Sequence, residues 1–326
     1  MKRILVTGGA GYIGSHTAKC LPQAGYTPIV YDNLSNGHRW AVRFGPFVEG
    51  DLADRDLLLD TLRAHEIDAV VHFAASAYVG ESVRDPLKYF RNNTANTVTL
   101  LDAMREAEVQ HIVFSSTCAT YGVPETVPIN EREAQEPINP YGESKLFVER
   151  VLRWAGEAHG LRWAALRYFN AAGADPDGEI GEVHDPETHL IPLAIQAGLG
   201  QRPPLKVFGT DYPTPDGTAV RDYIHVMDLG AAHIRALEYL AEGGDSVALN
   251  LGTGHGHSVR QVLDAVGDAL GHPVPADDAP RRAGDPPALI ADASLAHKVL
   301  QWQPKHSSLD TIVSTAVAWH KRQAAG

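Results

Sequence analysis

The sequence predicts an α/β fold in which a parallel, doubly wound sheet is followed by a smaller, mixed α/β lobe. Three observations support this prediction. Strand-like and helix-like segments alternate with short loops over the first half of the chain, a glycine-rich turn joins the first strand to the first helix, and an acidic residue ends the second strand. After residue 169 this alternation breaks down, and loops rich in proline and glycine multiply. We therefore expect a nucleotide-binding domain over residues 1–169, to which residues 222–251 return, and a substrate lobe over residues 170–326.

The first strand, residues 3–7, runs directly into a turn that contains Gly8, Gly11 and Gly14. Glycines at this spacing allow a tight turn and let a pyrophosphate approach the amide groups at a helix N-terminus. The second strand ends in Asp32, whose carboxylate can accept hydrogen bonds from the hydroxyls of an adenosine ribose and repels a 2′-phosphate. This unit predicts a Rossmann-type dinucleotide site that prefers NAD to NADP.

The same pattern repeats further along the chain. Strand-like segments end at Asp51, near Ala74 and at Ser115, and helix-like segments over 54–65 and 85–107 separate them. Ligands of doubly wound sheets bind at the carboxyl ends of the strands. These residues are therefore predicted to lie at the same edge of the sheet as the acid that ends the second strand.

A pair of titratable side chains lies at the start of the next predicted helix, which Pro140 introduces. Tyr141 and Lys145 are four residues apart, so both lie on one face of that helix. A free tyrosine titrates near pH ~10, but a neighbouring cation favours the phenolate and lowers that pKa. The pair could therefore remove a proton from a substrate hydroxyl at neutral pH. Thr117, just beyond the strand that ends at Ser115, is the hydroxyl that we expect to hydrogen-bond the same substrate oxygen.

Composition and charge exclude several classes of function. Of 326 residues, 44% are hydrophobic and 21% are charged, as in ordinary globular proteins. The net charge of -12 argues against nucleic acid or an anionic membrane as a partner, and no apolar run approaches the ~20 residues that cross a bilayer. Two cysteines, Cys20 and Cys118, make no disulfide framework, and the first glycine comes too early for a signal peptide. We therefore expect a cytoplasmic protein.

Two other patterns look like sites but are interpreted differently. Residues 252–257 resemble a second phosphate loop, yet no following strand ends in an acid at the expected distance. We expect a turn there, before a helix that Ser258 caps. The densest histidine cluster, over residues 184–189, lacks the helical H-E-x-x-H spacing of zinc sites. We therefore predict no metal.

The motifs together carry a resemblance to known proteins. They are Thr7-Gly8-x-x-Gly11-x-x-Gly14, Ser116-Thr117 before Tyr121-Gly122, Tyr141-x-x-x-Lys145, and three longer blocks over residues 168–173, 188–192 and 221–229. The first three resemble the extended short-chain dehydrogenase/reductase superfamily, and the blocks resemble its UDP-glucose 4-epimerase family, from residue 4 to about residue 302. The resemblance implies tightly held NAD, a homodimer, and interconversion of UDP-galactose and UDP-glucose. In that reaction the sugar is oxidised at C4, the 4-keto sugar rotates, and it is reduced again.

The predicted site residues combine the motifs with this resemblance. A nucleotide sugar carries a diphosphate, for which Arg221 and Arg282 are the best-suited cations, and Asp285 could accept hydrogen bonds from ribose hydroxyls. The resemblance places Phe208 near the uracil and Leu289 in the wall of the sugar pocket. The predicted substrate contacts are Thr117, Asn170, His189, Leu190, Phe208, Arg221, Arg282, Asp285 and Leu289. The predicted cofactor contacts are Gly8, Gly11, Tyr12, Ile13, Gly14, Asp32, Asn33, Asp51, Leu52, Phe73, Ala74, Ala75, Asn92, Ser115, Tyr141, Lys145, Tyr168 and Phe169.

Several alternatives stay open at this point. The same chemistry serves any UDP-sugar with a 4-hydroxyl, including UDP-N-acetylglucosamine and UDP-arabinose. A nucleotide-sugar 4,6-dehydratase is less favoured, because Cys118 and Ala119 stand where that family has an acid–base pair after the threonine. A non-enzymatic module that senses NAD ranks last, since it has no need for Tyr141, Lys145 and Thr117 together.

The helix expected over residues 141–158 also bears on assembly. It carries an apolar band wider than one core-facing stripe. Part of this band must face the sheet, because Tyr141 and Lys145 are anchored there. We expect the remainder, together with the helix over residues 85–107, to pack against a second copy of the chain.

Overall fold

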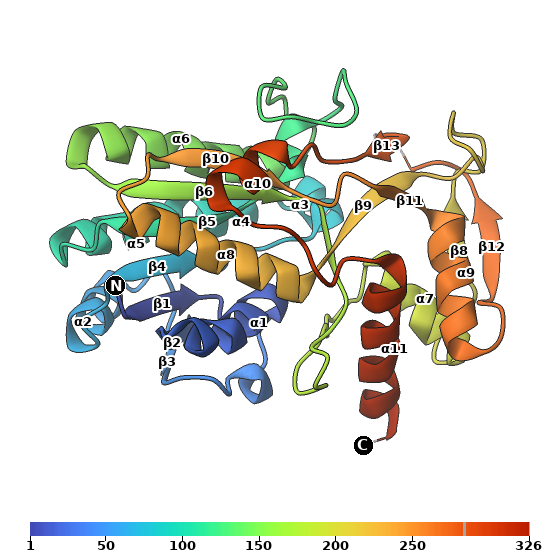
Figure 1. Cartoon of the computed structure of the whole chain (residues 1–326), viewed down its shortest axis with the longest axis horizontal. Helices are drawn as coiled ribbons and strands as arrows, with labels where there is room; N and C mark the ends of the chain where they lie inside the picture. The colour runs from blue at the N-terminus through green and yellow to red at the C-terminus, as the bar shows by residue number, and fades with distance from the viewer. Residues whose placement is uncertain (283–284, 326) are drawn as a thin grey trace.

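The computed structural model describes residues 1–282 and 285–325, and this part of the chain forms two lobes (Figure 1). The first lobe is built on a seven-stranded parallel sheet of order β10-β6-β5-β4-β1-β2-β3. Its strands are β1 (Arg3–Thr7), β2 (Thr27–Asp32), β3 (Phe47–Glu49), β4 (Ala69–His72), β5 (His111–Thr117), β6 (Arg162–Tyr168) and β10 (Val247–Leu251). The strand order changes direction between β1 and β4, as in doubly wound folds. The predicted α/β fold class is confirmed.

Helices cover both faces of this sheet, each over its own apolar core. On one face lie α1 (Tyr12–Cys20), α8 (Val226–Ala241) and α10 (Ser294–Leu300). On the other face lie α2 (Arg55–Ala64), α5 (Asn96–Glu106) and α6 (Pro140–His159). Strands covered on both faces read as continuous apolar runs, and all four residues of β4 are buried.

The helix predicted over residues 85–107 has a more complex structure. After α3 (Val79–Arg84), the chain forms α4 (Pro86–Tyr89), and a π-helical turn (Phe90–Ala95) joins α4 to α5. In this turn the Asn93 amide donates to Ser144 Oγ over 3.0 Å, which ties the turn to α6. A π-helical turn has no strong local sequence signal and is often found near functional sites, so the sequence alone indicated one regular helix.

The second lobe is a mixed α/β structure, as predicted. Its helices α7 (Leu190–Gly198), α9 (Val259–Leu270) and α11 (Leu309–Ala325) share a third apolar core. One small sheet has β9 (Val220–His225) paired with β7 (Asn170–Ala172), β11 (Gly256–Ser258) and β13 (Ala288–Leu289). Another pairs β8 (Leu205–Phe208) with β12 (Ala276–Ala279). Short 3-10 turns cover Leu21–Ala24, Arg39–Ala41 and Cys118–Tyr121.

The loop over residues 252–257 is a turn before a helix, as predicted. Ser258 Oγ accepts a hydrogen bond from the Gln261 amide, and the Ser258 amide donates one to the Gln261 side-chain oxygen, which forms a capping box at the start of α9. Ser258 is also the last residue of the short strand β11.

The return of the chain to the first lobe corrects one expectation. Within the predicted range 222–251, α8 and β10 lie on the first sheet, but residues 222–225 belong to β9 and pair in the second lobe. A strand-like run of residues predicts a strand and not its partner. We propose that the nucleotide-binding domain consists of residues 1–169 and 226–251 together with α10, which packs in the same core. None of the helices described here is both long and apolar enough to cross a membrane.

Candidate active site

A cavity of about 510 Å³ lies between the two lobes, at the carboxyl ends of strands β1, β2, β4 and β5. Its wall contains every residue of the predicted cofactor set, from Gly8 to Phe169. It also contains six of the nine predicted substrate contacts, namely Thr117, Asn170, His189, Arg221, Asp285 and Leu289. Residues from distant parts of the sequence thus converge on one space.

The glycine turn after β1 is shaped by close backbone contacts. Gly8 has a φ of +70°, and a Cβ on it would lie 2.5 Å from the Ala74 amide nitrogen. A Cβ on Gly14 would lie 2.2 Å from the Gly8 carbonyl oxygen. Gly11 differs, because the nearest described atom to its Cβ would be the Gly8 carbonyl oxygen at 3.3 Å. Its open side faces the cavity, where the first amides of α1 lack helical partners, so the turn fits a pyrophosphate.

Two acids and an amide at the ends of β2 and β3 form the adjoining wall. Asp32 accepts hydrogen bonds from the amides of Ala10 (3.0 Å) and Leu34 (2.8 Å), which fix the position of both carboxylate oxygens. Burial raises the pKa of Asp32, and these hydrogen bonds act against that shift. The Asn33 side chain donates to Asp51 over 2.7 Å. The remaining acceptor capacity of these groups suits ribose hydroxyls.

The predicted catalytic residues meet where α6 begins and β5 ends. Asn139 caps α6 by accepting a hydrogen bond from the Gly142 amide (2.9 Å), and a proline follows in the first turn. Lys145 Nζ donates to the carbonyl oxygen of Ser115 over 2.8 Å. Thr117 is the last residue of β5, so its hydroxyl and the side chains of Tyr141 and Lys145 all line the cavity.

Burial dominates the electrostatics of this group. It raises the pKa of Tyr141 to about 12, against a smaller opposite effect of a hydrogen bond with Thr117. It also lowers the pKa of Lys145 to about 7, against the attraction of Glu149. Among the protein groups, the pKa of Tyr141 is therefore raised overall, and burial outweighs any lowering by a neighbouring cation. Removing the charged form from water is the largest cause of the shift in each of the two groups.

A buried ion pair holds α6 against the sheet. Arg167 on β6 and Glu149 on α6 are 2.5 Å apart, and each side chain is 6% exposed. Ser116 donates to the same carboxylate over 2.5 Å, and Arg167 donates to the Tyr121 hydroxyl over 2.9 Å. Sequence reasoning missed this network, because its members are far apart in the chain and belong to no motif.

Three predicted substrate contacts lie outside the cavity wall. The Arg282 guanidinium lies over the Phe208 ring at 4.1 Å from its centroid, so these two residues cover each other. Leu190 packs at the edge of the third apolar core. Arg221 is in the wall and is paired with Asp285. Ala283 and Gly284, which separate Arg282 from Asp285 in the sequence, lie outside the described residues.

The cavity wall also contains residues that the sequence did not indicate as contacts. Tyr78, Glu182 and His184 are among them. Glu182 and His184 form a compact group with Glu187 and His189, and one potential ligand atom from each lies within 4.8 Å of the others. Carboxylate and imidazole groups at such distances can hold protons between them or bind a metal ion. The clustering of histidine and glutamate over residues 182–189 was the available sequence signal.

Comparisons with known proteins agree with this geometry. Residues 4–252 match the NAD dependent epimerase/dehydratase family. The chain is 53% identical over 324 residues to the UDP-glucose 4-epimerase of Halalkalibacterium halodurans, covering 99% of this chain and 97% of that protein. It is similar to the crystal structure of UDP-glucose 4-epimerase from Brucella ovis in complex with NAD (57% identity, TM-score 0.96, 98% of each chain). It is also similar to UDP-glucose-4-epimerase from Stenotrophomonas maltophila with bound NAD and formylated UDP-arabinopyranose (41% identity, TM-score 0.97, 100% and 99% of the chains).

Proposed function

The chain belongs to the NAD dependent epimerase/dehydratase family, and from this premise we propose that it interconverts UDP-glucose and UDP-galactose with NAD as its cofactor. The observation that carries the proposal is the convergence of Tyr141, Lys145 and Thr117 in a cavity whose other side is a glycine turn followed by a ribose-binding acid. A general base for a substrate alcohol beside a dinucleotide-binding site is the arrangement that alcohol oxidation requires.

The chemistry then follows from the position of each side chain. When bound, NAD supplies the acceptor for the C4 hydride and returns that hydride to the opposite face of the sugar. The Tyr141 hydroxyl oxygen removes the proton from the sugar 4-hydroxyl and later gives it back. Thr117 hydrogen-bonds the same sugar oxygen, and Lys145, with a pKa of about 7, supplies positive charge that favours the phenolate. The second lobe closes the cavity, so that the keto sugar can turn without leaving it.

A second candidate is the same reaction on another UDP-sugar. The Stenotrophomonas protein holds a UDP-pentose derivative, and Leu289 presents an apolar side chain in the cavity wall. A dehydratase remains disfavoured, because burial raises the pKa of Cys118 to about 12 and this thiol is therefore a poor acid or base for water elimination.

The proposal is tested on the purified protein. We expect it to carry NAD, and we expect addition of UDP-galactose to convert part of this NAD to NADH while UDP-glucose accumulates. The absorbance of the reduced nicotinamide and a chromatographic product assay measure the two steps, with UDP-N-acetylglucosamine and UDP-arabinose as comparison substrates. If no UDP-hexose changes the absorbance or yields an epimer, the proposed function is refuted.

We also propose a cytoplasmic homodimer. Large apolar side chains are exposed on α3, α4 and α6: Val83 is 63% exposed, Leu87 68% and Trp154 62%. Helices α3, α4 and α6 are in contact with one another, so these side chains can form one patch that a second copy covers. We expect a dimer by light scattering at micromolar concentration and a monomer after Leu87→Glu with Trp154→Glu. A wild-type monomer contradicts this part of the proposal.

A further inference from the structure

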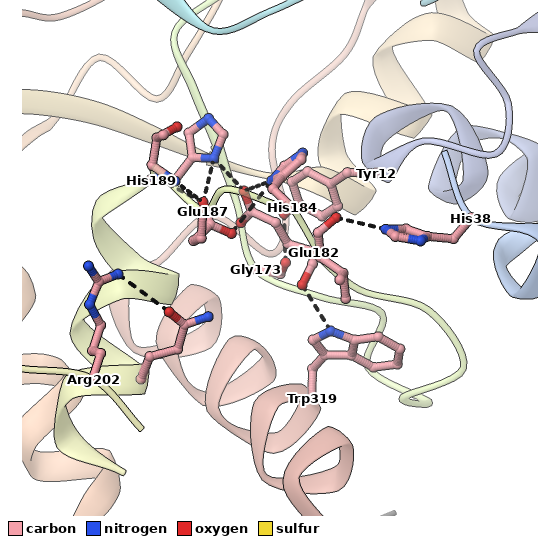
Figure 2. Close-up of polar contacts among 12 residues, drawn as sticks. Tyr12, His38, Gly173, Glu182, His184, Glu187, His189, Arg202 and Trp319 are labelled. Carbon is pink, nitrogen blue, oxygen red and sulfur yellow. Dashed lines mark hydrogen bonds and ion pairs between the residues drawn. The ribbon is translucent and has the colours of Figure 1, made fainter. Parts of the chain in front are cut away.

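A cluster of two histidines and two glutamates lines the cavity near α1, and only His189 of its members belongs to the predicted substrate contacts (Figure 2). His189 Nδ1 lies 2.8 Å from Glu182 and 3.0 Å from Glu187. His184 Nδ1 lies 3.2 Å from Glu182 and 3.6 Å from Glu187. The same ring nitrogen of each histidine therefore faces the same two carboxylates.

The arrangement is layered with respect to the cavity. The side chains of Glu182 and Glu187 are 5% and 6% exposed, whereas that of His189 is 43% exposed. Both histidines line the cavity, and Glu187 faces a smaller cavity of about 200 Å³ behind them. In Figure 2 the second ring nitrogen of each histidine points away from the glutamates. A protonated imidazole held in this way keeps one N–H free to donate to a ligand.

The carboxylates determine the charge of the two rings. Burial opposes the charged form, but the neighbouring carboxylates of Glu182 and Glu187, in ion-pair contact rather than well-aligned hydrogen bonds, outweigh it and raise the pKa of His184 to about 9. The same two glutamates raise the pKa of His189 to about 10, again against burial. Both rings are therefore cationic at neutral pH, and the pKa of each glutamate is lowered in turn.

Hydrogen bonds from three directions hold the loop that carries the cluster. The Tyr12 hydroxyl donates to the Gly173 carbonyl over 2.6 Å. Trp319 Nε1 donates to the Glu182 carbonyl over 3.1 Å, and His38 Nε2 lies 3.1 Å from the Val183 carbonyl (Figure 2). These contacts come from α1, from α11 and from the loop after β2. The histidines are thus preorganised rather than free to follow a ligand.

The charge of the cavity shows what the cluster can bind. Among the described side chains of its wall, the carboxylates are Asp32, Asp51, Glu182 and Asp285, whereas Lys145 and Arg221 are the lysine and arginine. Lys145 is committed to the Ser115 carbonyl, and Arg221 is paired with Asp285. A wall with this excess of acids repels polyanions unless it has further cations. His184 and His189 supply them next to Tyr12, at the start of the helix that fits a pyrophosphate.

We propose that His184 and His189, positioned by the buried carboxylates of Glu182 and Glu187, form an imidazolium pair that binds the diphosphate of a ligand in the cavity. This inference rests on the proposed function, which brings two diphosphates into the cavity, one in the nucleotide sugar and one in the cofactor. The chemistry is the same for both, and the experiment separates them.

The test uses the NAD-loaded protein and two ligands that differ in the diphosphate, UDP and uridine. Charge-assisted hydrogen bonds contribute enough that losing one changes affinity roughly tenfold. We expect Glu187→Gln to weaken UDP binding by about that factor in calorimetry and to leave uridine binding unchanged. If the variant instead loses NAD during dialysis and keeps its affinity for UDP, the pair serves the cofactor diphosphate. The matched control is Asp185→Asn, which changes an exposed acid of the same loop and should alter neither.

If Glu187→Gln does not fold, the proposal can still be tested on the unmodified protein by measuring the affinity for UDP and uridine over a series of pH values. Because the pKa values of both histidines are raised, their charge is present at neutral pH and is lost as the pH rises through about 9 to 10. The ratio of UDP affinity to uridine affinity should fall over that range, because titration of the uracil is common to both ligands and only UDP carries the diphosphate. The other titratable groups packed against the cluster are Tyr12 and Tyr78, whose rings lie edge-on to that of His184, and His320, which lies near both glutamates. The pKa values of both tyrosines are raised and that of His320 is lowered by burial, so these three are neutral in the range where the pair discharges.

Two results overturn the inference. One is an equal change of UDP and uridine affinity in Glu187→Gln together with a ratio of UDP to uridine affinity that does not change with pH. The other is stoichiometric Zn²⁺ in the purified protein that chelation removes and Glu187→Gln abolishes, since the cluster is then a metal site. Both are binding measurements, so they stay informative even where the epimerase assay fails.

Discussion

The two sides of the cavity bind by different means. On the side of the first lobe, the glycine turn presents backbone amides, and Asp32 is held by two backbone hydrogen bonds. On the side of the second lobe, the wall presents charged side chains in pairs, such as Arg221 with Asp285 and His189 with Glu182. Backbone groups carry no titratable charge, whereas each paired side chain depends on its partner and on pH. Binding by the glycine turn should therefore tolerate changes of pH that alter the charged pairs of the second lobe.

The same difference separates catalysis from recognition. Tyr141, Lys145 and Thr117 come from α6 and β5 of the first lobe, where the buried pair of Glu149 and Arg167 joins helix to sheet. Recognition of the substrate relies more on the second lobe, which can vary without disturbing the reacting groups. The following predictions test this division, from the largest expected effect to the smallest.

Removing the proton acceptor should abolish the chemistry of the first lobe and leave ligand binding by the second lobe intact. Tyr141→Phe removes the hydroxyl that takes the proton, and Lys145→Met removes the cation that favours the phenolate. General-base catalysis typically contributes ~10²–10⁴-fold, so we expect kcat to fall by at least that order. UDP binding, measured by calorimetry, should be largely retained. Near-normal turnover of Tyr141→Phe would refute the assignment of the base.

Breaking the buried ion pair should lower the free energy of unfolding of the first lobe. Glu149→Gln leaves the Arg167 charge buried without its partner, which typically costs about 3–5 kcal/mol. The matched control is Arg55→Gln, which removes solvent-screened pairs with Asp102 and Glu106 and should destabilise the protein much less. Urea unfolding followed by fluorescence measures both variants. Equal losses in the two variants argue against a special role for the buried pair.

Filling the open side of the glycine turn should affect the cofactor without affecting the fold. Within the protein, the Cβ of Gly11→Ala meets the Gly8 carbonyl oxygen at 3.3 Å, which requires only a small shift, and we expect it to project into the place of the predicted pyrophosphate. Overpacking of this kind costs about 1–3 kcal/mol, so we expect weaker NAD retention at unchanged thermal stability. Gly80→Ala, with no atom within 4 Å of the new Cβ, serves as the control. If Gly11→Ala retains NAD as the wild type does, the pyrophosphate lies elsewhere.

Changing the cavity wall on the second lobe should narrow the range of accepted sugars. We expect this effect to be the smallest of the four. Leu289 on β13 lines the cavity, and leucine leaves more room than tyrosine. A methyl-sized contact with an acetamido group is worth only ~1 kcal/mol. We therefore predict preference for the plain hexoses with measurable activity on N-acetyl sugars, and a much larger loss of N-acetyl activity in Leu289→Tyr. Coupled assays with both sugars measure the ratio, and an unchanged ratio excludes Leu289 as the selector.

Several features could be predicted because their causes are local. The glycines and Asp32 lie within one strand–turn–helix–strand unit, and Asn139, Pro140 and Ser258 act on helices that begin at the next residues. Tyr141 and Lys145 share a face because four residues make about one helical turn. The alternation of strands and helices indicated the doubly wound sheet for the same reason, since each element is visible in its own stretch of sequence.

Other features were decided only by the tertiary structure. The partner of β9, the π-helical turn before α5 and the pairing of Glu149 with Arg167 all depend on elements that are distant in the chain. Phe208 and Arg282 cover each other outside the cavity wall, although the resemblance indicated both as contacts. The histidines near residue 184 are visible in the sequence, but only packing against α1, α11 and the loop after β2 fixes them on the cavity. A side chain acquires its charge and direction from neighbours that folding brings to it, and sequence spacing does not specify those neighbours.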